Sequence, residues 1–289
     1  MTALLIATRN AHKAREIQQI LPADYQCLTL NDFPGAPAVV EDGATFAENA
    51  AKKVSALADW LATSIGRARL PVLHSLGDGG CRAVKIPAPQ ESVRDAPSAL
   101  PANPPFYLLA DDSGLEVDAL GGAPGVHSAR FAALDAAGAD NSPDHANNAK
   151  LLRLLEGVPP ARRTARFRCV LALCALFPPS ATGPVLFGNA SVMEERKVGR
   201  AVLCPPRRAR SARPTSLDRR ITLFEGVCAG RIALEPAGCG GFGYDPLFIP
   251  DGCAQTFAEL GDAVKNSLSH RARALQKLKD YLATPAANR

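Results

Sequence analysis

The sequence lacks any apolar run that approaches the roughly 20 residues needed to cross a bilayer. Its first residues, from Met1 to Ile6, also lack the basic segment that precedes the apolar core of a secretion signal. We therefore expect a soluble, cytoplasmic protein with no membrane partner.

Cysteine is present without any pattern typical of a cysteine site. None of the eight cysteines forms a Cys-x-x-Cys pair or has a histidine at metal-binding spacing. Zinc and redox sites are therefore disfavoured, and reduced, mostly buried thiols are expected. Cys169 and Cys174 lie in an apolar run, which places them in the core.

Internal repeats and the Gly-x-x-x-x-Gly-Lys-Ser/Thr motif of P-loop nucleotide-binding proteins are also absent. What the chain does have is 289 residues with 47% hydrophobic content, enough to bury a substantial core.

The net charge of +5 comes from one segment. Residues 196–220 contain nine lysines and arginines against the single Asp218, so the rest of the chain is mildly acidic. A solvated basic loop is the simpler interpretation, and a nucleic-acid-binding arm is the alternative.

The N-terminal pattern predicts a strand over residues 3–7, a tight loop, and a helix over 11–21. The loop Thr8-Arg9-Asn10, followed by Lys13, offers a hydroxyl, an amide, backbone N–H groups and a cation at a helix N-terminus. These groups suit a phosphate chain. An Asn-capped helix with a solvated lysine is the alternative.

A helix from about Thr45 to Ala62 is predicted by an apolar stripe and by the spacing of Thr45 and Glu48. Because that spacing gives Glu48 a capping duty, we interpret it as structural. Glu41, in the preceding loop, is free to bind a cation.

The central stretch places two carboxylates and a hydroxyl after a short apolar strand over 106–110. These are Asp111, Asp112 and Ser113, and we expect the strand to end there. Side chains of adjacent strand residues point to opposite faces, so one aspartate would coordinate or abstract while the other braces the turn. A solvated turn is the alternative.

The remaining patterns predict a helix over 146–155 and strands over 164–176, 186–192 and 223–234. Residues 64–105 carry seven prolines and no sustained periodicity, and residues 196–220 are basic and proline-bearing. We interpret both as surface insertions in a single domain spanning 1–289.

Two C-terminal motifs complete the candidate site. The run Gly241-Phe242-Gly243-Tyr244-Asp245-Pro246 offers ring faces for stacking and a carboxylate acceptor. Lys265 and the pair His270-Arg271 are expected to gather three cations at one helix start. A glycine-rich turn and a solvated helix entry are the alternatives.

Taken together, these motifs resemble, in order, those of the Ham1-like non-canonical purine nucleoside triphosphate pyrophosphatases. The resemblance implies an α/β fold with a twisted mixed sheet flanked by helices, two lobes and a central cleft. It also implies a homodimer and Mg²⁺-dependent hydrolysis of ITP, dITP or XTP to the monophosphate and pyrophosphate, which removes deaminated purines from the nucleotide pool.

In such an enzyme Asp112 would be the general base and, with Glu41, a metal ligand. The residues implied to bind substrate are Thr8, Arg9, Asn10, Lys13, Ser113, Phe242, Gly243, Tyr244, Asp245, Lys265, His270 and Arg271. Lys13 and Lys265 would neutralise the leaving pyrophosphate, and Arg271 or a backbone N–H would donate to the oxygen at purine position 6.

Two departures from the family pattern stand out: Arg9 occupies a position where glycine is common, and both insertions lengthen the chain. Arg9 either restricts the loop or adds a phosphate contact. Two rival functions stay open. One is a pyrophosphatase for other modified or canonical nucleotides, and the other is a catalytically silent RNA-binding protein that uses the basic insertion.

Overall fold

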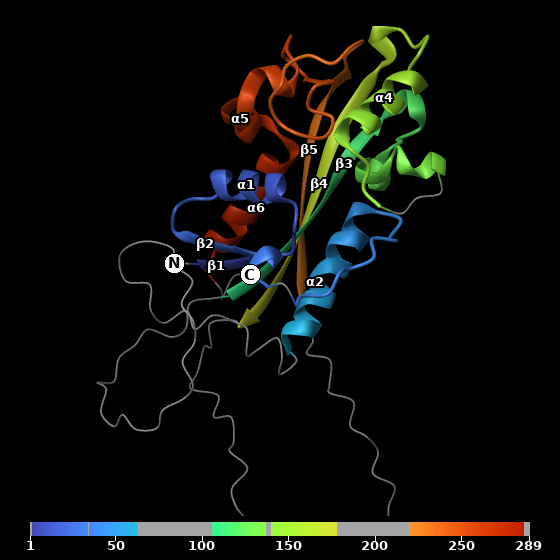
Figure 1. The fold of residues 1–289 in the computed structure, drawn as a ribbon. Coiled ribbons are helices and arrows are strands. Elements are labelled where there is room, and N and C mark those ends of the chain that lie inside the picture. Colours follow the sequence, from blue (N-terminus) through green and yellow to red (C-terminus); the bar gives the residue numbers. More distant parts are fainter. Residues whose placement is uncertain (1, 34, 63–105, 137–139, 178–219, 286–289) are drawn as a thin grey trace, which may run out of the picture.

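The computed structural model describes residues 2–33, 35–62, 106–136, 140–177 and 220–285. Its centre is a six-stranded sheet in the order β2-β1-β3-β4-β5-β6. The strands are β1 (Thr2–Ile6), β2 (Tyr25–Thr29), β3 (Phe106–Val117), β4 (Thr164–Phe177), β5 (Ile221–Ile232) and β6 (Phe248–Pro250). β1 runs parallel to β2 and β3, and the remaining neighbours are antiparallel, so the expected mixed sheet is confirmed (Figure 1).

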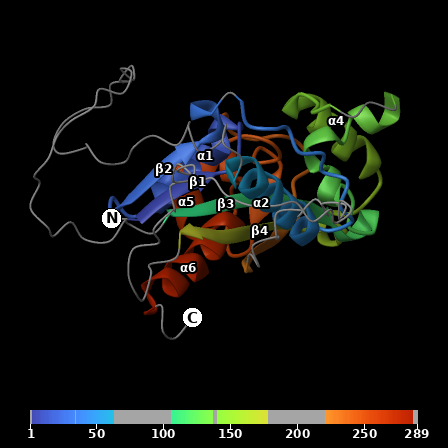
Figure 2. The same cartoon turned by 90° about the horizontal axis from the view of Figure 1, so that it is seen from below.

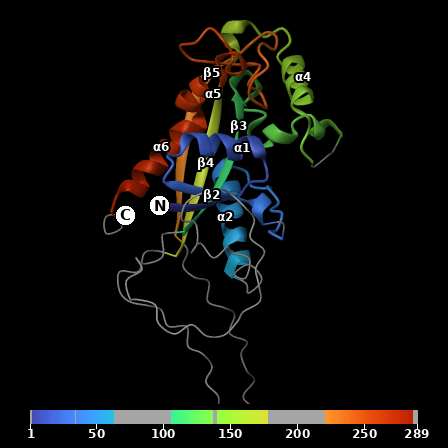
Figure 3. The ribbon, with the colours of Figure 1, turned by 60° about the vertical axis from the view of Figure 1, so that its left-hand side comes forward.

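Helices cover both faces of this sheet. They are α1 (Ala11–Ile20), α2 (Phe46–Ala62), α4 (Asp144–Leu154), α5 (Phe257–Leu268) and α6 (His270–Ala283). One core contains the apolar face of α2, and a second contains those of α1 and α6, because alternate side chains of β1, β3 and β4 point to opposite faces. Figure 3 shows α2 and α6 on opposite sides of the long strands.

A third core builds a second lobe at the far end of the long strands. It joins Leu115 and Val117 of β3 to Leu151 of α4 and to Phe248 and Phe257. α4 and the neighbouring short turns lie away from β1 and β2 (Figure 2). The expected arrangement of two lobes is therefore present, with β3 running through both.

The prediction that this strand ends at Asp111 is wrong. β3 continues to Val117, with Asp111 opposite Leu171 and Asp112 opposite Val170 on β4. The two carboxylates stay within the sheet because buried cations pair with them, as described below. The alternation of their side chains between the two faces is confirmed.

Other local predictions hold to within two residues. The helices expected over 11–21, 45–62 and 146–155 are α1, α2 and α4, and the strands expected over 164–176 and 223–234 are β4 and β5. Glu48 has the capping role predicted: its carboxylate accepts from Ala44 N at 2.8 Å, and its own N–H donates to Thr45 Oγ1 at 3.1 Å. The strand predicted over 186–192 and the insertion over 64–105 lie outside the described residues, as does the insertion over 196–220 except for Arg220.

Cys169 and Cys174 are buried in the core, as predicted. Within the described ranges, no helix has both the length and the apolar character required to span a bilayer.

Gly226 on β5 is where α6 packs most closely against the sheet. A Cβ there would overlap the carbonyl oxygen of His270 and the backbone nitrogen of Ala274, neither of which can rotate away. We expect Gly226→Ala to lower the free energy of unfolding by about 1–3 kcal/mol, as overpacked substitutions do. Thermal melts would measure this, with Ala229→Ser at an exposed position of the same strand as control. Equal melting temperatures for the two variants would contradict the tight packing.

Candidate active site

The loop between β1 and α1 forms a capped helix N-terminus. Asn10 Oδ1 accepts hydrogen bonds from His12 N at 2.9 Å and Lys13 N at 3.1 Å, and Thr8 Oγ1 accepts from Asn10 N at 3.1 Å. Asn10 and Lys13 line a pocket of the protein, whereas Thr8 is buried beside it. The positive end of the helix dipole and the Lys13 ammonium thus lie at one end of the pocket.

Arg9 lies differently from the rest of the loop. Its guanidinium donates to Ala36 O at 2.6 Å, and the residue is not among those that line the pocket. The contact ties the loop to the segment after β2.

Asp111 is the most heavily paired carboxylate of the site. Lys13 Nζ lies 2.6 Å from its Oδ1, Arg271 Nε donates to its Oδ2 at 3.0 Å, and Ser113 Oγ donates to Oδ1 at 3.0 Å. The Cys169 thiol lies 3.1 Å from Oδ2. Burial raises the pKa of Asp111, but Arg271 and Lys13 outweigh that effect and hold it well below its ordinary value. Asp111 is therefore a fixed anion that organises its neighbours.

The ion pairs continue from Arg271 to the other end of the pocket. The Arg271 guanidinium also pairs with Glu16, and Lys265 Nζ lies 2.6 Å from Glu16 Oε1. Lys265 then reaches Asp245 Oδ2 at 2.6 Å, whose carboxylate accepts from Phe242 N at 2.8 Å. A continuous line of alternating charges thus runs through the protein, in the order Lys13, Asp111, Arg271, Glu16, Lys265 and Asp245.

Asp112 points to the opposite face of β3, where α2 packs. Lys53 of α2 lies 2.9 Å from Asp112 Oδ1 and 2.9 Å from Glu41 Oε2. Burial raises the pKa of Asp112 and the Glu41 carboxylate adds to the increase, against the opposing effect of Lys53. Asp112 is therefore a stronger base than an ordinary aspartate.

Glu41 and Asp112 fit a divalent cation. Asp112 Oδ2 is buried and has no hydrogen-bond partner among the described residues, so one coordinating oxygen is free. The two carboxylates share one ammonium, which leaves a net negative charge. Within the described ranges, no group of three or more His, Cys, Asp or Glu side chains is placed to hold a metal ion, so water and substrate oxygens would complete the coordination.

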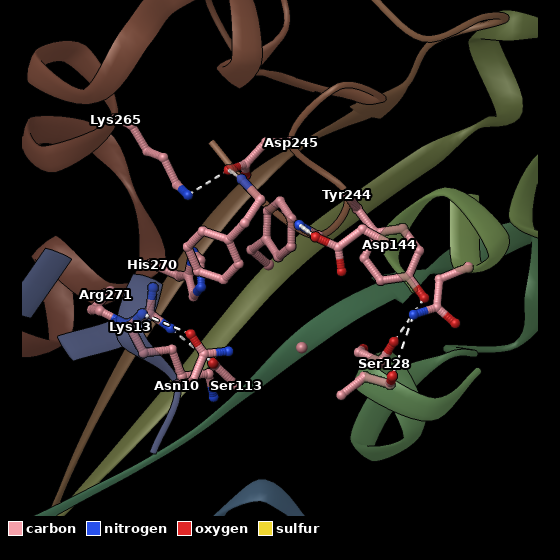
Figure 4. Close-up of a pocket in the computed structure, with 16 residues that line it drawn as sticks. Asn10, Lys13, Ser113, Ser128, Asp144, Tyr244, Asp245, Lys265, His270 and Arg271 are labelled. Atoms are coloured by element: carbon pink, nitrogen blue, oxygen red, sulfur yellow. Dashed lines mark hydrogen bonds and ion pairs between the residues drawn. The ribbon is translucent and has the colours of Figure 1, made fainter. Parts of the chain in front are cut away.

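The other end of the pocket is aromatic. The Phe242 ring stacks on His12 at 5.2 Å, and Lys265 Nζ lies 4.4 Å from the Phe242 ring centroid. His270 stacks on Phe167 at 4.8 Å, and Tyr244 donates its hydroxyl to Ser128 O at 2.9 Å. In Figure 4, His270 and Arg271 lie on the same side of the pocket as Lys13, Asn10 and Ser113, and Tyr244, Asp144 and Ser128 lie on the other side. The other lining residues are Gly114, Ala129, Asp144, Asn147, Gly243, Asp245 and Arg271.

The expectation of three cations at one helix start needs correction. Lys265 lies in the last turn of α5, while His270 and Arg271 begin α6 after the Ser269 cap. Burial, together with Arg271 and Lys265, holds the pKa of His270 well below 6.5, so its ring is neutral. The charges of Lys265 and Arg271 are matched by carboxylates.

Sequence reasoning missed Lys53 and Glu16. Lys53 follows the buried Ala50 by three residues and precedes the buried Leu57 by four, so it lies on the apolar face of α2. A lysine at such a position needs a buried anion, and that signal could have found it. The partners of Glu16 come from α5 and α6, so nothing near it in sequence indicates its role.

The comparisons with known proteins decide the family. The model of the Ham1 family matches residues 4–73, 90–189 and 204–281. The chain belongs to the Ham1 family. The unmatched segments 74–89 and 190–203 overlap the two predicted insertions.

Curated relatives are similar over nearly the whole chain. The dITP/XTP pyrophosphatase of Desulforamulus reducens is 38% identical over 96% of this chain and 94% of its own length. The dITP/XTP pyrophosphatase of Geobacter sulfurreducens is 38% identical over 98% of this chain and 97% of its own.

Solved structures agree with the family assignment. The Ham1 protein of Staphylococcus aureus is 27% identical with a TM-score of 0.58, covering 97% of this chain and 98% of its own. The HAM1 protein of Coxiella burnetii is 27% identical with a TM-score of 0.59, covering 98% of both chains.

The buried pairs of Glu16 predict acid sensitivity. Burial raises the pKa of Glu16, but Arg271 and Lys265 bring it below 4.5, so its ionised form stabilises the fold above pH 4.5 and that contribution is lost as the pH falls through the folded-state pKa. We expect Glu16→Gln to lower the free energy of unfolding at pH 7 by about 3–5 kcal/mol, since it leaves buried cations underpaired. The difference from wild type should shrink below pH 4.5.

Urea denaturation between pH 3 and pH 7 would measure the effect, with Glu156→Gln at an exposed position as control. A difference that stays constant over this range would show that the charge of Glu16 contributes nothing to stability.

Proposed function

We propose that the protein hydrolyses non-canonical purine nucleoside triphosphates, namely ITP, dITP and XTP, to the monophosphate and pyrophosphate. One observation carries the proposal: a single pocket joins a phosphate-binding helix start at Asn10 and Lys13 to an aromatic end at Phe242 and His270. Asp112 is not among the lining residues; it directly precedes the lining residue Ser113 and faces α2, with a raised pKa. The names and similarity of the curated relatives support the same activity.

Asp112 acts as the general base. Water attacks the α-phosphorus, a new P–O bond forms, and the bond from that phosphorus to the bridging oxygen breaks to release pyrophosphate. The water proton passes to Asp112, whose raised pKa suits this transfer. Lys53 holds Oδ1 at 2.9 Å, whereas Oδ2 has no hydrogen-bond partner among the described residues.

Glu41 and Asp112 would hold Mg²⁺, which supplies positive charge to the phosphate oxygens when bound. Among the cations in the line of ion pairs, Lys13 can reach the leaving pyrophosphate, because its side chain is 19% exposed. Lys265 has only 4% of its side chain exposed and two carboxylate partners, so it braces the aromatic end rather than the phosphates.

Base selection rests on hydrogen-bond donors at the aromatic end. Hypoxanthine and xanthine present an oxygen at position 6, where adenine presents an amino group that donates. The neutral His270 ring can donate to that oxygen. Arg271 lines the pocket, and its guanidinium also donates to Ser113 Oγ at 3.0 Å. A homodimer and a cytoplasmic location complete the proposal.

The first test is Mg²⁺-dependent release of pyrophosphate from ITP, XTP, GTP and ATP. We expect turnover of ITP and XTP that exceeds that of ATP by about 10⁴-fold, the discrimination typical of sites built on such hydrogen bonds. Asp112→Asn should lose at least about 10²-fold in kcat, since general bases contribute that much. Glu156→Gln serves as control. Efficient hydrolysis of ATP, or of no triphosphate, would contradict the proposal.

A second test concerns Lys53. Lys53→Met leaves Asp112 and Glu41 without their shared cation, so we expect kcat to fall by about tenfold or more while the Mg²⁺ concentration needed for half-maximal activity changes. Lys52→Met, one residue away on the exposed face of α2, is the matched control. Unchanged kinetics for Lys53→Met would remove this lysine from the site.

A further inference from the structure

The loop that carries Phe242 is held by α4 from across the pocket. Gly243 N donates to Asp144 Oδ2 at 2.6 Å, and Gly243 O accepts from Asn148 Nδ2 at 3.1 Å. The N–H and the C=O of one residue are thus both bound by a single helix. Figure 4 shows Asp144 beside Tyr244 at this end of the pocket.

The two side chains are spaced to make this contact. Asp144 and Asn148 are four residues apart in α4, so they lie on the same face of the helix. Gly243 has φ of +65°, a conformation that favours glycine. Asp144 and Asn148 thus hold the loop through the backbone of Gly243.

The contact links parts of the protein that belong to different lobes. α4 packs in the core of the second lobe through Leu151, whereas Phe242 stacks on His12 of α1 in the first lobe. On its other side the loop is held by Asp245, which accepts from Phe242 N at 2.8 Å. Holding Gly243 from α4 therefore sets how far the Phe242 ring reaches across the pocket.

We infer that Asp144 and Asn148 are positioning residues that hold the Phe242 ring against the purine of the substrate. This inference rests on the proposed function, because it assigns the aromatic end of the pocket to the base. Asp144 and Asn148 therefore affect the binding of the base, and the binding of the phosphates stays unchanged.

Kinetics with ITP test the inference. We expect Asp144→Ala and Asn148→Ala each to raise KM for ITP by about tenfold, the equivalent of one aromatic contact of about 1.4 kcal/mol, while kcat changes less than about twofold. The inhibition constant of IMP should rise in parallel, and that of pyrophosphate should stay the same. His145→Ala, at an exposed neighbouring position of α4, is the matched control.

Asp144→Asn separates positioning from a direct effect of charge. The amide oxygen of asparagine still accepts from Gly243 N, so this variant should recover most of the loss seen in Asp144→Ala. If Asp144→Asn were as impaired as Asp144→Ala, or if the losses appeared in kcat or in pyrophosphate inhibition, the inference would be overturned.

Amide hydrogen exchange provides a readout that needs no activity. Exchange at Gly243 should accelerate in Asp144→Ala and stay slow in wild type and Asp144→Asn, because the acceptor of its N–H is removed only in the first. Equal exchange in all three proteins would refute the hydrogen bond from Gly243 to Asp144. Slow exchange at Gly243 in a wild-type protein that hydrolyses no triphosphate would instead refute the proposed function and, with it, the role of Asp144 and Asn148 in base binding.

Discussion

The pairing of Asp111 with Arg271 is the interaction on which the site depends. Both residues are buried, with side chains 0% and 1% exposed, and a buried charge is tolerated only when a partner compensates for its lost hydration. Each partner extends the pairing further, through Lys13 on one side and Glu16 on the other. The two ends of the pocket are therefore connected by electrostatics as well as by packing.

This arrangement separates two tasks that adjacent residues perform on one strand. Asp111 faces α1 and α6, where paired cations keep it ionised, and it organises the side chains around the substrate. Asp112 faces α2, where burial and Glu41 raise its pKa and Lys53 leaves one oxygen free. The same chemical group thus has a lowered pKa on one face and a raised pKa on the other, because the environments differ.

Apolar periodicity and capping patterns are local signals, and they were sufficient for most helices and strands. The Thr45–Glu48 spacing and the stripe of α2 are examples. The mixed sheet and most of the pocket residues followed from the resemblance to the Ham1 family. The prediction that the strand ends at Asp111 failed because adjacent carboxylates in a sequence are typical of a turn. The cations that allow Asp111 to lie within a central strand come from α1 and α6, far away in the sequence. The sequence interpretation also mistook His270 for a cation. The burial of its ring against Phe167 and the repulsion by Arg271 and Lys265, which lower its pKa, are visible only in three dimensions.

The continuous passage of β3 through both lobes has a consequence for how the protein can vary in length. Loops at the surface tolerate inserted residues, but a single residue gained or lost between Phe106 and Asp111 would exchange the faces of the two aspartates. Asp111 would then meet Lys53, and Asp112 would meet Arg271. Lengthening of this chain is therefore confined to the connections between strands, and the number of residues between Phe106 and Asp111 in β3 stays fixed.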